Sequence, residues 1–136
     1  NIGEYTDCIL KPNEVECWRA VYNNEGYIDA GYDEFIEAAK LLAKKNRSTV
    51  FCTLGKRGSI VTDGDRTEKA DAVLFDGEVD ICGAGDTSLS AFSAAIAAKT
   101  ELKAAAQFAG LASGVTVRKI GVTGTASPEE IEALAQ

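Results

Sequence analysis

The stretch that decides the fold runs from Asp80 to Ala97 and reads DICGAGDTSLSAFSAAIA. Gly83 and Gly85 flank one alanine, Asp86 follows at once, and the remaining residues are small and compatible with a helix. A glycine turn that opens a helix is typical of a phosphate site, because the first amides of a helix lack partners and its dipole favours anions. The aspartate is therefore the residue that needs an explanation.

Four interpretations of this turn compete. A P-loop requires a lysine after the glycines, and none is present. A dinucleotide-binding turn requires a third glycine or an alanine where Ser88 stands, and Asp86 would repel the pyrophosphate. A turn that only starts a buried helix remains open. In the fourth interpretation, the amides of residues 83–86 stabilise a phosphoryl group in transfer while Asp86 receives the proton of the attacking hydroxyl. Gly85 is then expected to hold a backbone conformation that a side chain would disfavour.

Outward from this turn, the hydrophobic pattern alternates between strands and helices. Asn13 and Thr100 are predicted helix N-caps, Asp63-Gly64 is a hairpin signal, and Ser127 opens a capping box. The alternation predicts an α/β domain with a mostly parallel sheet. Because the first residues are polar and few strands are visible, we expect the back half of a longer fold. The predicted strands cover residues 7–12, 48–53 and 58–63, and the predicted helices cover residues 13–22, 32–46, 84–99 and 101–119.

Composition excludes several classes of function. A chain of 136 residues suffices for one domain, and a net charge of −7 gives no electrostatic basis for binding nucleic acid. No apolar run approaches the roughly 20 residues that cross a membrane. There is no histidine and no C-x-x-C spacing among the four cysteines, which argues against zinc and against Ser-His or Cys-His nucleophiles. Cys8 and Cys52 lie in apolar runs and are expected to be buried and reduced, as in a cytoplasmic protein.

Three motifs together resemble the ribokinase-like (PfkB-type) family of carbohydrate kinases. They are the stretch quoted above, KPNEVE over Lys11–Glu16, and TLGKRGSIV over Thr53–Val61, in the order of the family. The tail VTVRKIGVTGTASPEEI is most similar to the heptose-phosphate kinase domain of ADP-heptose synthesis enzymes. The resemblance implies the C-terminal part of a three-layer α/β/α fold with a mostly parallel sheet.

The resemblance also implies roles for individual residues. Asp86 would be the catalytic base, and Gly83, Ala84 and Gly85 would form the anion hole. Asn13 and Glu16 would place the Mg²⁺ of ATP through water. Taken alone, Asn13 is more readily explained as a helix cap and Glu16 as an ordinary exposed helix acid.

Further residues are implied on the nucleotide side. Thr53, Gly55 and Gly58 would lie along the phosphates and ribose, while Lys56 and Arg57 are either phosphate ligands or solvated cations at a turn. In FAGLASG, Gly110 stands where many members place an asparagine against the nucleotide. A loop beside the anion hole would bind a monovalent cation such as K⁺. This is the loop of residues 119–125, with Lys119, Gly121 and Thr125, and the backbone of Asp80 and Cys82 would complete the site.

The sequence thus predicts ATP-dependent phosphoryl transfer to a hydroxyl of a small sugar or sugar phosphate. Residues 1–136 would be the nucleotide-binding C-terminal portion of the kinase domain, without the N-terminal part that binds the sugar. This chain alone is therefore expected to be inactive, and its exposed sheet edge favours a homo-oligomer. The alternative is a nucleotide-binding module without catalysis.

Overall fold

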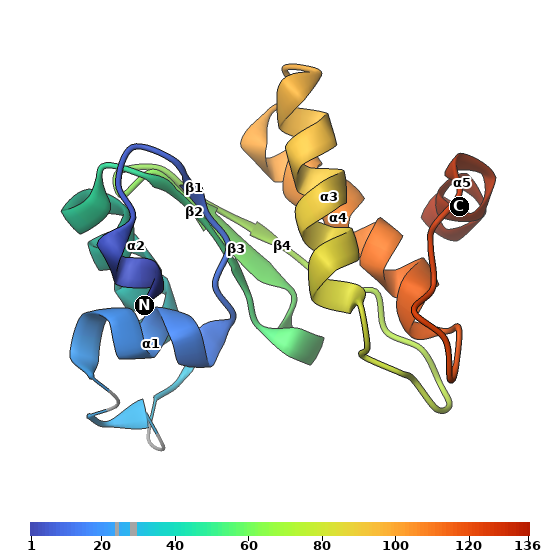
Figure 1. Cartoon of the computed structure of the whole chain (residues 1–136), viewed down its shortest axis with the longest axis horizontal. Coiled ribbons are helices and arrows are strands. Elements are labelled where there is room, and N and C mark those ends of the chain that lie inside the picture. Colours follow the sequence, from blue (N-terminus) through green and yellow to red (C-terminus); the bar gives the residue numbers. More distant parts are fainter. Residues whose placement is uncertain (24, 28–29) are drawn as a thin grey trace. The chain divides into compact units, whose positions relative to one another are not determined.

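The computed structural model describes residues 1–23, 25–27 and 30–136. The chain divides into two compact units, Asn1–Lys69 (unit 1) and Ala70–Gln136 (unit 2). Figure 1 shows the sheet and its helices in unit 1 and the helices of unit 2.

The sheet of unit 1 is mixed, with described strands in the order β1-β2-β3-β4. β1 and β2 run parallel, because a long connection with two helices separates them, whereas β2 and β3 are antiparallel and joined by a short turn. The hairpin predicted at Asp63-Gly64 is confirmed, since β3 and β4 are neighbours in the sheet. The elements of this unit are η1 (Ile2–Glu4), β1 (Ile9–Leu10), α1 (Glu14–Tyr22), α2 (Tyr32–Asn46), β2 (Thr49–Thr53), η3 (Gly55–Arg57), β3 (Ser59–Thr62) and β4 (Thr67–Ala70).

The core of unit 1 lies between the sheet and α1 with α2. Val50 and Cys52 of β2 share this core with Leu42 of α2, and all three are fully buried. Trp18 of α1 packs edge-on against Phe35, with ring centroids 5.5 Å apart. Helix spacing in α1 and α2 buries one apolar face of each helix, whereas β2 is buried on both faces, with Phe51 as inaccessible as Val50 and Cys52.

Two expectations about the start of unit 1 need correction. The strand predicted over Asp7–Pro12 pairs with β2 only at Ile9 and Leu10. Cys8 precedes this short pairing and is exposed, whereas Cys52 in β2 is buried as expected.

Unit 2 consists of α3 (Ala84–Ala97), α4 (Leu102–Val117) and α5 (Pro128–Ala135). α3 and α4 pack against each other, and the buried face of α4 is made mostly of small side chains. The cap of α4 is Glu101 rather than Thr100, because the Thr100 amide donates to the Ala95 carbonyl and so completes the end of α3. The capping box predicted at Ser127 is confirmed.

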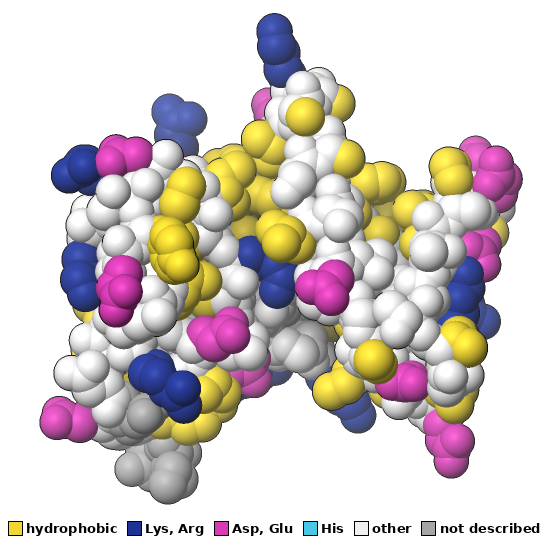
Figure 2. Space-filling view, in the orientation of Figure 1, with side chains coloured by type: hydrophobic (Ala, Val, Ile, Leu, Met, Phe, Trp, Pro, Cys, Tyr) yellow, Lys and Arg dark blue, Asp and Glu magenta, His cyan; other side chains and the backbone are white. Residues whose placement is uncertain are grey.

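The surfaces of both units carry apolar side chains among scattered charges (Figure 2). Tyr5 and Ile9 are exposed in unit 1, and Leu74, Ile81 and Val122 in unit 2. Within the described residues, no helix combines the length and the apolar character needed to cross a bilayer.

Candidate functional site

The glycine turn forms a tight entry into α3. Gly83 is the N-cap, with φ +77° and ψ −6°, and its carbonyl accepts the first helical hydrogen bond from Thr87 at 2.9 Å. The Ala84 amide donates to the Ile81 carbonyl at 3.1 Å, so this member of the predicted anion hole already has a partner. The amides of Gly85 and Asp86 lie in the first turn, where a helix provides no acceptor. These two amides are the donors best placed for an anion.

The residue of the turn that requires glycine is Gly83 and not Gly85. Only Gly83 has a left-handed φ, whereas Gly85 lies inside α3 in ordinary helical conformation. A Cβ on Gly83 would also meet the Thr123 Cγ2 atom at 2.9 Å. The expectation of a special backbone conformation at Gly85 is therefore wrong.

Asp86 lies in the first turn of α3 and is exposed to solvent. A carboxylate at this position is favoured by the partial positive charge of the helix N-terminus. Behind it, the buried Thr116 hydroxyl of α4 lies 3.2 Å from the Thr87 hydroxyl and 3.2 Å from the Ala112 carbonyl. This contact fixes the first turn of α3 to the last turn of α4.

The Asp80 carboxylate connects the glycine turn to the loop after α4. One oxygen accepts from the Cys82 amide at 2.9 Å and the other accepts from the Gly121 amide at 3.0 Å. The Cys82 amide, followed by the Gly121 amide, lowers the pKa of Asp80 because both stabilise the charged form. The Cys82 Sγ atom lies 3.9 Å from the Thr123 hydroxyl. The predicted residues on these two segments are thus brought together within unit 2.

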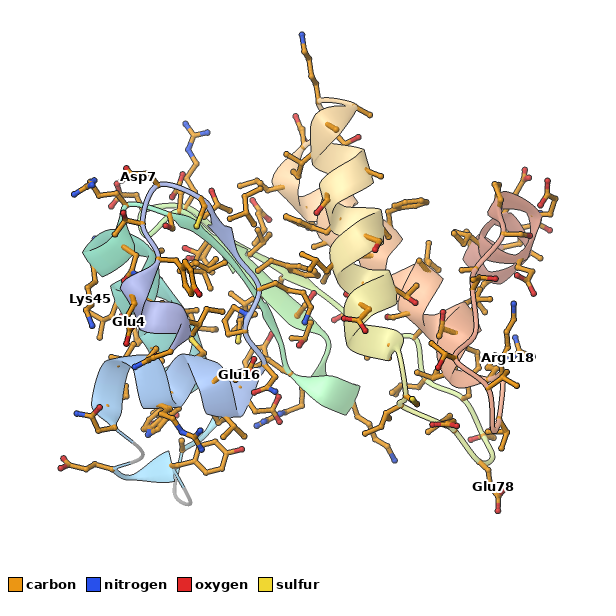
Figure 3. The ribbon with its side chains drawn as sticks, in the orientation of Figure 1. Glu4, Asp7, Glu16, Lys45, Glu78 and Arg118 are labelled. Carbon is orange, nitrogen blue, oxygen red and sulfur yellow. The ribbon has the colours of Figure 1, made fainter. Side chains whose placement is uncertain are left out.

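Lys119 closes the other side of the same loop. Its ammonium donates to the Thr125 carbonyl and lies 2.8 Å from Oε1 of Glu130. The Lys119 ammonium, followed by the Ser127 amide, lowers the pKa of Glu130. Arg118, labelled in Figure 3, precedes this lysine and stacks over the Phe75 ring at 4.9 Å.

Gly110 is set apart from these residues. It lies in α4 six positions before Thr116, which is about 9 Å along the helix axis. A Cβ on Gly110 would lie 3.8 Å from the Asp71 carbonyl oxygen, and the Ser113 hydroxyl donates to the Gly110 carbonyl. Its contact with a nucleotide stays a prediction.

In unit 1, the motifs KPNEVE and TLGKRGSIV meet at the carboxyl ends of β1 and β2. Asn13, just beyond β1, forms a parallel bridge with Thr53, the last residue of β2, and the Thr53 amide donates to the Pro12 carbonyl at 3.0 Å. The predicted metal residues form a capping box: Asn13 Oδ1 accepts from the Glu16 amide and Glu16 Oε2 accepts from the Asn13 amide, both at 2.9 Å. Glu16 lies in the first turn of α1 (Figure 3).

The turn after β2 carries two cationic side chains, Lys56 and Arg57, which lie in different surroundings. Gly55 and Gly58 both have positive φ, +55° and +86°, and the Gly58 carbonyl accepts from the Leu54 amide at 2.8 Å. The Arg57 guanidinium lies 4.8 Å from the Phe35 ring centroid and 3.7 Å from a Glu14 oxygen. Arg57 therefore packs on its own unit, while Lys56 is exposed in η3.

The side-chain oxygens of Asn13 and Glu16 suit Mg²⁺ only through water molecules bound to the ion. In the part of the chain that the structure describes, no group of three or more acidic or thiol side chains surrounds a common point. Asn13 and Glu16 each spend one oxygen on the cap and remain exposed, which leaves the second Glu16 oxygen for a water of the ion. This agrees with the water-mediated role that the resemblance implies.

Sequence reasoning missed the partners that hold these residues. Thr116 and Thr123 lie far along the chain from the glycine turn, and no local pattern connects them to it. Glu130 was visible as a capping residue, but its ion pair with Lys119 depends on how the loop folds back.

A scan of family models matches residues 6–130 to the pfkB family of carbohydrate kinases. Among curated proteins, Bifunctional protein HldE of a Nitratiruptor species is 35% identical over 127 residues, covering 91% of this chain and 26% of that protein. The HldE of Hyphomonas neptunium is 36% identical over 125 residues, covering 92% of this chain and 25% of its own length. The chain thus spans about a quarter of the length of these curated relatives. The similarity to ADP-heptose synthesis enzymes is confirmed.

Solved structures agree on the fold. Ribokinase from Thermotoga maritima superposes with a TM-score of 0.78 at 23% identity, covering 93% of this chain and 41% of that one. Phosphofructokinase-2 from Escherichia coli in complex with potassium gives a TM-score of 0.81 at 19% identity, covering 99% and 43%. The fold is therefore the ribokinase-like α/β fold that the motifs predict. Together with the family match over residues 6–130, this shows that the chain belongs to the pfkB family of carbohydrate kinases.

Proposed function

We propose that this chain is the nucleotide-binding C-terminal portion of a cytoplasmic carbohydrate kinase. The reaction is transfer of the γ-phosphoryl group of ATP to a hydroxyl of a small sugar or sugar phosphate. Family membership and the HldE relatives support this class of substrate. The remaining part of the kinase domain would provide the groups that hold the sugar.

The observation that carries the proposal is the start of α3. A left-handed Gly83 directs the chain into a helix whose first-turn amides, at Gly85 and Asp86, have no intrahelical acceptor. Amides of this kind, together with the helix dipole, stabilise the negative charge that develops on a transferring phosphoryl group. Because Asp86 is part of the same turn and exposed, its carboxylate can lie beside the acceptor hydroxyl.

The chemistry assigns one proton transfer to Asp86. As the acceptor oxygen forms its bond to the γ-phosphorus, the bond to the bridging oxygen of ADP breaks and the hydroxyl proton passes to the Asp86 carboxylate. A pure binding module would gain nothing from a carboxylate that faces phosphates. This argues for catalysis over the non-catalytic alternative.

The unit 1 residues are assigned to the nucleotide. Thr53, Gly55 and Gly58 would lie along the phosphates and ribose, with the exposed Lys56 beside them in the same turn. Bound Mg²⁺ would neutralise charge on the phosphates. Asn13 and Glu16 would hold its water shell, and Gly110 would face the nucleotide. The resemblance also implies K⁺ at the loop of residues 119–125, where the Lys119 ammonium already donates to the Thr125 carbonyl.

The test uses the full-length kinase with Asp86→Asn. We expect turnover to fall by a factor on the order of 10² or more, the scale of a lost general base, while ATP affinity stays within a few-fold. Glu132→Gln, an exposed acid of α5, is the matched control and should leave turnover unchanged. An Asp86→Asn enzyme that keeps more than about a third of wild-type turnover would remove Asp86 from the mechanism and favour the binding module.

A further inference from the structure

The loop of residues 119–125 contains a positive charge of its own. The aliphatic part of Lys119 crosses the backbone of Gly124 so closely that a Cβ there would lie 2.8 Å from Lys119 Cδ and 3.0 Å from its Cβ. The ammonium then reaches the Thr125 carbonyl and both oxygens of Glu130, at 2.8 and 2.9 Å. Gly124 therefore leaves room for the side chain that closes the loop on α5.

One carbonyl of the loop predicted to bind a monovalent cation, that of Thr125, and both carboxylate oxygens of the neighbouring Asp80 already accept hydrogen bonds. Each oxygen of the Asp80 carboxylate accepts from an amide, of Cys82 and of Gly121. The Thr125 carbonyl accepts from the Lys119 ammonium. A K⁺ ion added at the Thr125 carbonyl would have to displace the Lys119 ammonium, which carries the same single positive charge. The side chains present thus fit an internal ammonium better than an external ion.

We propose that the Lys119 ammonium takes the place of a monovalent cation beside the glycine turn and acts as a positioning residue. Lys119 holds the loop to α5, the loop presents the Gly121 amide to Asp80, and Asp80 in turn holds the Cys82 amide. The same loop carries Thr123, which lies against Gly83. Loss of the ammonium would loosen the entry into α3 unless K⁺ enters the loop.

The first test does not depend on kinase activity. Amide hydrogen exchange of residues 119–125 is measured for the wild-type chain and for Lys119→Met, in KCl and in tetramethylammonium chloride at matched ionic strength. We expect wild-type protection to be equal in the two salts. In Lys119→Met, exchange should be on the order of 10-fold faster in tetramethylammonium and should slow again in KCl. Lys40→Met removes a lysine from the exposed ion pair with Glu37 and should change nothing in this loop.

Three results would overturn the proposal. They are wild-type protection that depends on K⁺, a Lys119→Met loop that exchanges like wild type in both salts, and a Lys119→Met loop that K⁺ does not restore. The last of these would reduce Lys119 to an ordinary ion pair.

The kinetic consequence rests on the proposed function and is tested in the full-length kinase. Wild-type turnover should be the same in both salts, and Lys119→Met should lose a factor on the order of 10 in tetramethylammonium and recover in KCl. A wild-type enzyme stimulated by K⁺ would contradict the proposal. An enzyme without kinase activity would contradict the proposed function and leave the exchange result standing.

Discussion

Gly83 is the position in the glycine turn where a side chain should cost stability. We expect Gly83→Ala to lower the free energy of unfolding of unit 2 by about 1–2 kcal/mol, because an L-residue is disfavoured at φ +77°. Contact with Thr123 Cγ2 would add to this cost. Calorimetry of the two variants Gly83→Ala and Gly85→Ala measures the difference.

Gly85→Ala is the matched control, because Gly85 is already helical. Alanine there should keep or raise stability, by up to about 1 kcal/mol, since it favours the helix. In the full-length kinase the same change should lower turnover, because a methyl group would crowd the approach of phosphate to the turn. Equal destabilisation by both variants would contradict the assignment of the left-handed residue.

At the level of elements, substitutions in the capping box of α1 can distinguish a structural role of Asn13 from a role in binding Mg²⁺. Asn13→Ala should cost about 1 kcal/mol of stability because the Glu16 amide loses its acceptor, whereas Asn13→Ser should keep the cap. If Asn13 also orients the water shell of Mg²⁺, both variants should weaken binding of Mg-ATP by the full-length kinase. Thermal midpoints and titration calorimetry measure the two effects. Unchanged binding in the serine variant would leave Asn13 as a cap only.

The turn between β3 and β4 should make unit 1 sensitive to acid. The Arg66 amide, followed by the Asp65 amide, lowers the pKa of Asp63 by hydrogen bonding to its charged carboxylate. A carboxyl group whose folded pKa is lowered stabilises the fold above its unfolded pKa of about 3.9, and this contribution is lost as the pH falls through the folded value. Asp63→Asn keeps an acceptor oxygen but does not titrate.

Urea unfolding of wild type and Asp63→Asn, followed by circular dichroism, should therefore differ at pH 7 and converge as the pH falls below about 4. Other acids titrate in the same range, but they are common to both proteins and cancel in the difference. A constant difference between the two proteins from pH 7 to pH 3 would exclude this role for the Asp63 charge.

Local signals predicted the helices and several of their caps, but not the length of β1 or the cap of α4, and they did not predict contacts between residues far apart in sequence. Asn13, Ser127 and Asp63-Gly64 were predicted correctly because caps and turns depend on neighbours within three or four residues. The identity of the left-handed glycine depends on the Ile81 carbonyl and on the loop after α4, which the motif does not contain. The same holds for the ion pair that engages Lys119.

At the level of the whole molecule, the chain alone should not phosphorylate any sugar. It spans 26% of its HldE relative and 41% of the superposed ribokinase. In-line transfer needs the acceptor held within about 3–3.5 Å of the phosphorus, a contribution of up to roughly 7–11 kcal/mol that the residues assigned here do not supply. A coupled assay over hexoses, pentoses and heptose phosphates tests this, with ATP hydrolysis without sugar as the control.

Turnover above that background for any sugar would show that these residues suffice. The edge strand β1, with Ile9 partly exposed, should also promote self-association of the isolated chain, which sedimentation measures.

The side chains that fluoresce most strongly, tryptophan and tyrosine, all lie in one of the two units. The single tryptophan, Trp18, and all four tyrosines lie between Tyr5 and Tyr32, inside unit 1. Intrinsic fluorescence therefore originates entirely in unit 1, and unit 2, with the glycine turn and Asp86, contributes only phenylalanine. A ligand that touches the first turn of α3 alone would leave the emission spectrum unchanged, and unfolding of unit 2 would pass unseen in a fluorescence melt. A Phe108→Trp reporter on the exposed side of α4 would give this half of the chain a signal of its own.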